Sequence, residues 1–146
     1  MHGIDDKDLA ILEALKKDSS LSIQKIAKKT GIPIATVHHR LKKLQGEGVI
    51  KKYTIVIDPV RLGKKLVAHI LVKAMPKTDH IALLEKLMKH EFVEDGSAIT
   101  GQFDVLIKVR VADVDELDQY VLKHLRTYDE IAQTDSMIAF RNMVKE

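Results

Sequence analysis

Residues 31–53, GIPIATVHHRLKKLQGEGVIKKY, decide which domain the first part of the chain forms. Gly31 permits a tight turn, and Pro33 is tolerated best in the first turn of a helix. The apolar residues that follow recur at helical spacing, which predicts a helix from about residue 33 to residue 45. Its inward stripe should consist of Ile34, Val37, Leu41 and Leu44, and its opposite face is polar and basic.

Two further helices are expected before this one. Asp5 is placed to cap the first helix, with Asp8 three residues later at the capping-box position, and Leu9 is expected to face inward. Ser22 is placed to cap a second helix of barely two turns. All three helices precede residue 46.

A run of β-branched residues follows the third helix. Residues 49–57, VIKKYTIVI, predict a strand with Lys51 and Lys52 near its start. Three helices with a short glycine-containing turn between the second and third, followed by a basic strand, predict a winged helix-turn-helix over residues 1–58. In this motif the helix after the turn enters the major groove of DNA.

Eight polar or basic side chains of this domain are candidates for contacts with DNA. The third helix supplies five on its outward side and at its start: Thr36, His38, His39, Lys42 and Lys43. Lys51 and Lys52 are candidates for phosphate contacts. Arg40 borders the apolar stripe, so a phosphate contact and a structural ion pair are equally open for it.

The distribution of charge agrees with a partner that is a polyanion. The net charge of the chain is +3, but residues 1–58 carry eleven Lys and Arg against seven Asp and Glu, while the remainder carries thirteen against fourteen. A basic part joined to a nearly neutral part suits a nucleic-acid-binding module, although basic surfaces also serve solubility.

Length and composition exclude several classes of protein. With 146 residues and 45% hydrophobic content, the chain can form one ordinary domain or two small ones. The absence of cysteine excludes disulfides, thiolate nucleophiles and cysteine metal sites. No run of about 18 apolar residues occurs, and the first ten residues lack the segments of a signal peptide. We therefore expect a cytoplasmic protein with no membrane partner.

The second half of the chain has a different organisation. Pro59 and Gly63 interrupt regular structure, which makes residues 59–65 the expected linker. Residues 66–146 then repeat the order strand, helix, strand twice, and this pattern predicts a βαββαβ ferredoxin-like domain with helices on one face of an antiparallel sheet. The expected fold class is α+β.

The sheet face without helices needs a cover. His69, Leu71 and Lys73 share one side of the first strand of this domain, so neither sheet face is purely polar. A second subunit is the simplest cover, and a monomer with scattered exposed apolar residues is the alternative.

Motifs along nearly the whole chain resemble those of one protein family. They are D-x-x-D-x-x-I-L-x-x-L from Asp5, I-A-x-x-x-G-I, V-x-x-R-L-x-x-L, G-V-I-x-x-Y ending at Tyr53, and T-G-Q-F-D at residues 100–104. In this order and spacing they resemble the leucine-responsive/asparagine-regulator (Lrp/AsnC, feast/famine) family of prokaryotic transcription regulators. Pro33 departs from the family, which often has a capping Ser there.

The resemblance implies partners as well as a fold. It implies double-stranded DNA, a homodimer formed through the βαββαβ (RAM or ACT-like) domains, assembly into tetramers or octamers, and an amino acid or similar metabolite bound at an interface. No cofactor is expected. The resemblance thus describes a sequence-specific transcription regulator modulated by a small effector.

The hairpin at residues 100–104 is the candidate effector site. In the simpler interpretation it is only a turn, with a positive φ at Gly101 and with Asp104 exposed at the start of a strand. In the functional interpretation, its N–H groups receive a carboxylate and Asp104 receives an ammonium group, the two charges of a free amino acid. The candidate effector residues are Thr100, Gly101, Gln102, Phe103 and Asp104, with Thr134 and Ser136 of the last strand as weaker candidates.

Three other functions are alternatives to a transcription regulator. The resemblance also extends to siroheme decarboxylases, but no obvious base and nucleophile pair occurs in the chain. Metal sensing is suggested by the adjacent His38 and His39, yet neighbouring residues on a helix diverge by 100° and no histidine pair has i, i+4 spacing. An architectural protein would bind DNA without strong sequence preference.

Overall fold

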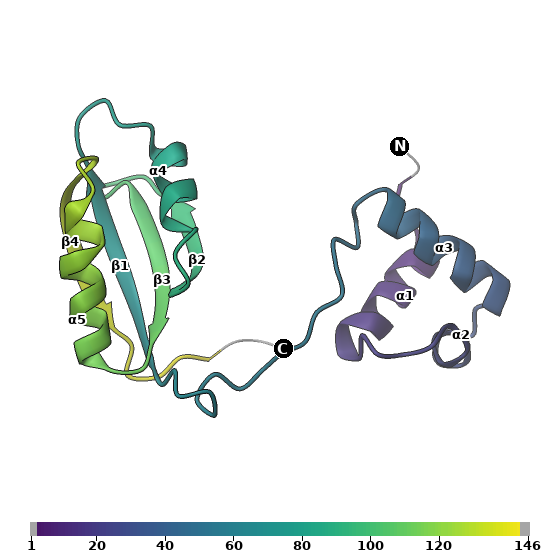
Figure 1. Cartoon of the computed structure of the whole chain (residues 1–146). Helices are drawn as coiled ribbons and strands as arrows, with labels where there is room; N and C mark the ends of the chain where they lie inside the picture. Colours follow the sequence, from purple (N-terminus) through teal and green to yellow (C-terminus); the bar gives the residue numbers. More distant parts are fainter. Residues whose placement is uncertain (1–2, 144–146) are drawn as a thin grey trace. The chain divides into compact units, whose positions relative to one another are not determined.

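A computed structural model describes residues 3–143, and its contacts divide the chain into two compact units, one up to residue 57 and one from residue 58 onward. The first unit contains three helices (Figure 1). They are α1 (Asp6–Lys17), α2 (Ile23–Thr30) and α3 (Ile34–Gly46). The second unit contains all the strands.

Two helices of the first unit begin at residues whose side chains cap a helix, and α2 ends at a glycine. The Asp5 carboxylate accepts a hydrogen bond from the Asp8 N–H, and the Asp8 side chain accepts one from the Asp5 N–H, which confirms the predicted capping box. Ser22 caps α2, and Gly31 ends it with a φ of 70°. α3 has Pro33 at its N-cap and no side-chain hydrogen bond there.

Two predicted core residues of this unit are exposed. Ile34 was expected on the inward stripe of α3, but its side chain is 53% exposed. Ile32 is buried instead, and with Val37 it occupies the two positions of a hydrophobic staple around the Pro33 cap. The inward position at this end of α3 is therefore filled before the helix begins. On α1, Leu9 is likewise 51% exposed, and the buried residues are Asp8, Ile11 and Leu15.

The predicted strand at residues 49–57 is absent from the described chain. Residues 51–58 form no helix or strand, and Ile55 and Val56 are about 80% exposed. A strand requires a partner for its backbone hydrogen bonds, and β propensity alone does not provide one. The prediction of a strand at residues 49–57, the wing of the motif, was therefore wrong for a single chain. The β-branched residues are present, but they have no neighbouring strand to pair with in the described residues.

The second unit has the predicted βαββαβ order. Its elements are β1 (Leu66–Ala74), α4 (His80–Leu87), β2 (Val93–Ala98), β3 (Val105–Val111), α5 (Val114–Lys123), a short 3-10 helix (Leu125–Thr127) and β4 (Ile131–Ile138). Asp79 caps α4 and Asp113 caps α5. The four strands are antiparallel in the order β2-β3-β1-β4.

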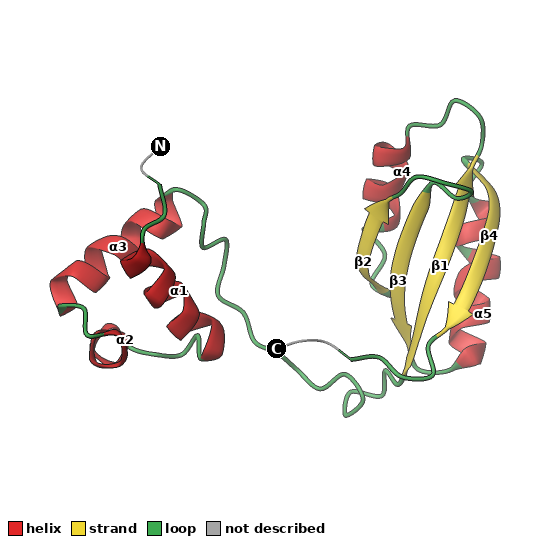
Figure 2. Cartoon of the chain, turned by 180° about the vertical axis from the view of Figure 1, so that it is seen from behind, coloured by secondary structure: helices red, strands yellow, loops and turns green. Residues whose placement is uncertain are grey.

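Both helices of this unit cover the same sheet face (Figures 1 and 2). Alternate residues of β1 and β3 point into the core between the helices and the sheet, where Ile70, Val72, Ile107 and Val109 are fully buried. The intervening residues, among them Leu71 and Leu106, are only partly buried on the other face. Within residues 3–143, no helix is long and apolar enough to cross a membrane.

Candidate nucleic-acid interface and effector site

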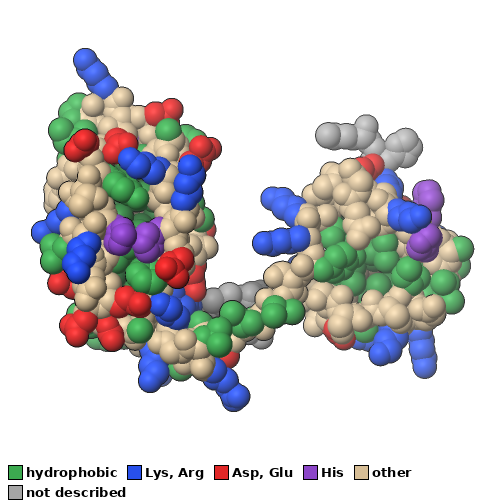
Figure 3. Space-filling view, viewed as in Figure 1, with side chains coloured by type: hydrophobic (Ala, Val, Ile, Leu, Met, Phe, Trp, Pro, Cys, Tyr) green, Lys and Arg blue, Asp and Glu red, His purple; other side chains and the backbone are tan. Residues whose placement is uncertain are grey.

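The outward face of α3 carries the predicted DNA-contacting residues of that helix. His38, His39 and Lys42 are exposed, and Thr36 is half-buried beside the exposed Ala35. Histidine and basic side chains lie together on the surface over α3 (Figure 3). Imidazole, hydroxyl and ammonium groups are all able to hydrogen-bond base edges or phosphates.

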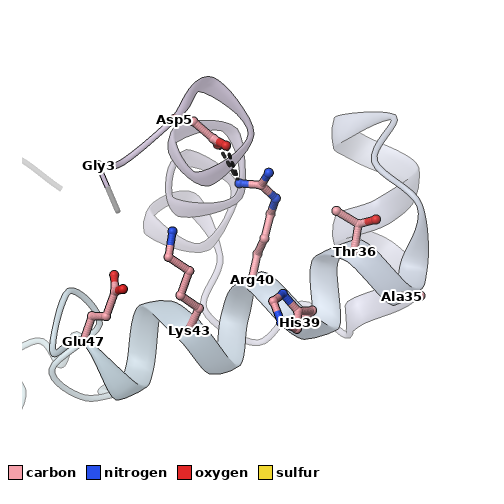
Figure 4. Close-up of a pocket in the computed structure, with 8 residues that line it drawn as sticks. All are labelled: Gly3, Asp5, Ala35, Thr36, His39, Arg40, Lys43 and Glu47. Carbon is pink, nitrogen blue, oxygen red and sulfur yellow. Dashed lines mark hydrogen bonds and ion pairs between the residues drawn. The ribbon is translucent and has the colours of Figure 1, made fainter. Parts of the chain in front are cut away.

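A hollow borders one side of this face. It has a volume of about 780 Å³ and is lined by Gly3, Asp5, Ala35, Thr36, His39, Arg40, Lys43 and Glu47. Figure 4 shows that Asp5 from the start of α1 points toward Arg40, while Thr36, His39 and Lys43 extend from α3 around the hollow. On the other side of α3, a second hollow of about 480 Å³ is lined by residues that include His38 and Lys42. The exposed side chains of His38, His39 and Lys42 form a ridge along α3, and this ridge lies between the two hollows.

Arg40 joins α3 to α1. Its Nη1 donates to the Asp5 carboxylate at 2.6 and 2.7 Å and to Asp8 Oδ1 at 2.8 Å. Asp8 is completely buried, and Lys43 Nζ lies 3.7 Å from its other oxygen. Of the two roles left open for Arg40, these contacts support the structural ion pair. The sequence patterns missed Asp8 as its partner, because a core carboxylate has no periodic signal.

The ion pair shifts the pKa values of Asp5 and Arg40. The Arg40 hydrogen bond, followed by that of the Asp8 backbone, lowers the pKa of Asp5 to about 2. Asp5 and Asp8 in turn raise the pKa of Arg40, so the pair remains charged throughout the ordinary pH range. A pair of this kind fixes the angle at which α3 is held against α1.

Three other basic candidates differ from Arg40 and Lys43, which form ion pairs with aspartates. Lys42, Lys51 and Lys52 are exposed, and none of them has an ion pair within residues 3–143. Lys51 and Lys52 lie in the extended segment after α3 instead of on the predicted strand. Within the described residues, these ammonium groups have no ion pair that would compete with phosphate.

The hairpin between β2 and β3 has the predicted turn but a different role for its aspartate. Thr100, Gly101 and Gln102 are exposed, and Gly101 has a φ of 120°. Phe103 is half-buried. The Ile99 N–H donates to the Asp104 carbonyl at 2.9 Å and closes the loop.

Asp104 is largely enclosed, which corrects the expectation that it is exposed. Its side chain is 14% exposed and accepts the Ala74 N–H at 2.8 Å, where the pairing of β1 with β4 shifts register. Lys73 Nζ lies at 3.3 Å and His80 Nε2 at 3.9 Å. The Ala74 hydrogen bond, then Lys73, lowers the pKa of Asp104. The carboxylate thus satisfies a backbone group that strand pairing leaves free.

The two weaker effector candidates lie apart from the hairpin. Thr134 and Ser136 line a groove of about 290 Å³ beside α5, together with Asp118 and Arg126. No residue of the 100–104 hairpin lines this groove. Within one unit, the seven candidates therefore form two separate surfaces.

The histidines do not form a metal site in the described residues. No cluster of three or more His, Asp or Glu side chains with metal-binding geometry occurs within residues 3–143. His90 and His124 come close, with ring centroids 4.7 Å apart, on the helix-covered face of the second unit. The Nδ1 of His90 accepts the Phe92 N–H at 3.2 Å, so its lone pair is already used.

Comparisons with known protein families agree with both units. Residues 4–51 match the model for winged helix-turn-helix DNA-binding domains, and residues 67–146 match that of the Lrp/AsnC ligand binding domain. The chain is 35% identical over 143 residues to the HTH-type transcriptional regulator FL11 of Pyrococcus furiosus, covering 97% of this chain and 93% of that protein. The chain belongs to the Lrp/AsnC family of transcription regulators.

Solved structures of transcription regulators have the same fold. E. coli AsnC matches with a TM-score of 0.90 and 28% identity, covering 99% of this chain and 97% of that one. A transcriptional regulator of Neisseria meningitidis, solved as its L-Met complex, matches in fold with a TM-score of 0.91 at 21% identity, covering 98% and 94%. The helix-turn-helix domain and the antiparallel α+β domain are thus those of a transcription regulator.

Proposed function

We propose that this regulator binds specific sequences of double-stranded DNA by inserting α3 into the major groove, and that it acts in the cytoplasm. The observation that carries the proposal is the exposed ridge of α3. His38, His39 and Lys42 project there without partners in the core, while Arg40 ties the helix to α1. A helix held rigidly by its neighbours can position side chains accurately against base edges.

The basic residues around the ridge suit the phosphate backbone. Lys42, Lys51 and Lys52 can approach phosphates without first losing an ion pair, and each such contact releases a counterion from DNA. Lys43 has to share its charge with Asp8, so its contribution to binding should be smaller. Phosphate contacts would position the domain, and α3 would then read the sequence.

Selection from genomic DNA tests this proposal. The purified full chain is incubated with a pool of genomic fragments, and the retained fragments are sequenced. We expect an enriched, imperfectly palindromic motif whose half-sites are about one helical turn, or a multiple of it, apart. His39→Ala should change the enriched motif, whereas Glu85→Ala, an exposed change on α4, should leave it unaltered. Retention without enrichment would indicate an architectural DNA-binding protein instead.

We infer that a second copy of the chain covers the open sheet face, and that such dimers assemble further. Leu71 and Leu106 lie on that face between the charged side chains of Lys73, Lys108 and Arg110. A mixed apolar and charged face of this kind suits a self-complementary interface. Two copies would present two copies of α3 to a palindromic site.

We further propose that an amino acid modulates assembly or DNA binding. The match to a ligand binding domain and the L-Met complex of the Neisseria neighbour support this class of effector. In the proposed site, the exposed hairpin at residues 100–102 receives the ligand carboxylate, and Thr134 or Ser136 of another copy adds hydroxyl groups. Calorimetry against the twenty amino acids should find at least one ligand, which Gly101→Val should no longer bind. Absence of any binder contradicts the proposal.

A further inference from the structure

Ile34 is an exposed apolar side chain at the start of α3. It occupies the first position of α3, it is 53% exposed, and Ile32 and Val37 already close the core behind it. Packing inside the unit therefore does not explain a large β-branched residue at this position. Its position at the N-terminal end of α3 suggests another use.

One of the residues proposed to contact DNA is a neighbour of Ile34 on the helix. His38 lies one turn further along the same side, and Ala35 follows directly. Ala35 is small and exposed, so it does not prevent a close approach at this end of the helix. The N-terminal residues of a recognition helix are the ones that contact base edges in helix-turn-helix complexes.

The major groove offers one principal apolar group to such a side chain. Thymine carries a C5-methyl group at the groove edge, cytosine has only a hydrogen on the same carbon, and the polar edge groups of the ordinary bases are hydrogen-bond donors and acceptors. Covering Ile34 with a methyl group would remove apolar surface of both molecules from water. Placing it against a donor or an acceptor would desolvate that polar group without a hydrogen bond.

We propose that Ile34 is a specificity-determining residue that contacts the C5-methyl group of a thymine in each half-site. This inference rests on the proposed insertion of α3 into the major groove. It adds to that proposal the base that Ile34 contacts, thymine, and the group that it contacts, the C5-methyl group. It also predicts that the DNA site contains thymine at a position next to the bases contacted by His38.

Replacing thymine by deoxyuridine tests the contact, because this change removes only the methyl group and preserves base pairing. The full chain first selects duplexes from a library with a random core. Each thymine of an enriched duplex is then replaced singly by deoxyuridine, and the dissociation constants are compared. Loss of one buried methyl group should weaken binding about fourfold at one position of each half-site.

Two protein variants show whether Ile34 makes the contact. Ile34→Ala should bind the thymine and deoxyuridine duplexes equally, and alanine favours the helix, so α3 should still form. Leu9→Ala is the matched control, because Leu9 is 51% exposed on α1, and it should keep the fourfold discrimination. Parental discrimination in Ile34→Ala would overturn the assignment.

The outcomes also separate this inference from the function on which it rests. If sequences are enriched but no deoxyuridine replacement weakens binding of the parent chain, the thymine contact is wrong and sequence-specific binding stands. If no sequence is enriched, both are wrong.

Discussion

At the scale of single residues, two enclosed aspartates serve the fold in different ways. Asp8 lies in the core of the first unit as the partner of Arg40, and Asp104 closes the end of a strand pair in the second. Neither role follows from the local sequence. The residues at positions 8 and 40 are 32 apart in the chain, and only the packing of α1 on α3 brings them together.

Asp8→Ala should destabilise the first unit by about 2 kcal/mol, because Arg40 and Lys43 lose a buried charged acceptor. Asp6→Ala is the matched control, since Asp6 lies in the same turn of α1 but is exposed. Hydrogen exchange of α1 and α3 peptides in the full chain measures the difference. Equal exchange in the two variants would show that the buried pair contributes nothing.

Asp104→Ala should destabilise the second unit, because the Ala74 N–H then has no acceptor. Asp104→Asn should cost less, since its amide oxygen can still accept that hydrogen bond. Urea unfolding, followed by hydrogen exchange of β1 peptides, ranks the three proteins. If the asparagine variant is stable but loses the amino acid, the carboxylate also has a role in effector binding. Identical stability of all three proteins would contradict the structural role.

At the scale of elements, the sequence predicted what local chemistry determines. Asp5 and Ser22 cap helices where expected, because a cap needs only groups within three residues of each other. The polar face of α3 was predicted for the same reason, since helical geometry alone decides which side chains share a face.

The predictions that were wrong depended on contacts beyond the element. Helical periodicity could not indicate that Ile32 fills the inward position expected for Ile34. Ile32 lies in the turn before α3, and the conformation of that turn places it in the core. Composition could not show whether residues 49–57 find a strand partner. For the effector site, the turn at Gly101 could be predicted from its residues, but the enclosure of Asp104 could not, because it depends on β1.

The junction of α4, β2 and α5 should make the second unit sensitive to acid. His90 packs against Phe92, Tyr120 and His124, with ring centroids 4.5 to 4.9 Å away. Burial, then the nearby His124, lowers the pKa of His90, and Glu91 acts weakly in the opposite direction. The folded state therefore favours neutral His90.

This depressed pKa gives the sign of the pH dependence. The unfolded chain takes up a proton at His90 near its ordinary pKa of 6.5, before the folded chain does. The stabilisation is thus present above about pH 6.5 and is lost as the pH falls through the lower, folded value. Urea midpoints at pH 7.5 and 5.5 should differ more in the parent than in His90→Phe. His38→Gln, an exposed change in the first unit, should keep the parental difference.

At the scale of the whole molecule, assembly should depend on the open sheet face. Leu106→Glu adds charge to that face and should shift the full chain toward monomer, because a buried unpaired carboxylate is costly. Ile81→Glu is the control on exposed α4 surface. Light scattering at about 100 µM measures the molar mass over a range where weak dimers with micromolar Kd form. A monomeric parent chain would contradict the proposed dimer.

The most direct test of sequence-specific DNA binding is a competition between two duplexes of equal length and composition. One duplex contains the sequence that the full chain enriches, the other has the same bases in scrambled order, and both are measured at the same physiological salt concentration. A regulator that reads bases through α3 should prefer the enriched duplex by about a thousandfold or more. Equal affinities for the two duplexes would show that the chain contacts only phosphates, and would contradict the proposed function.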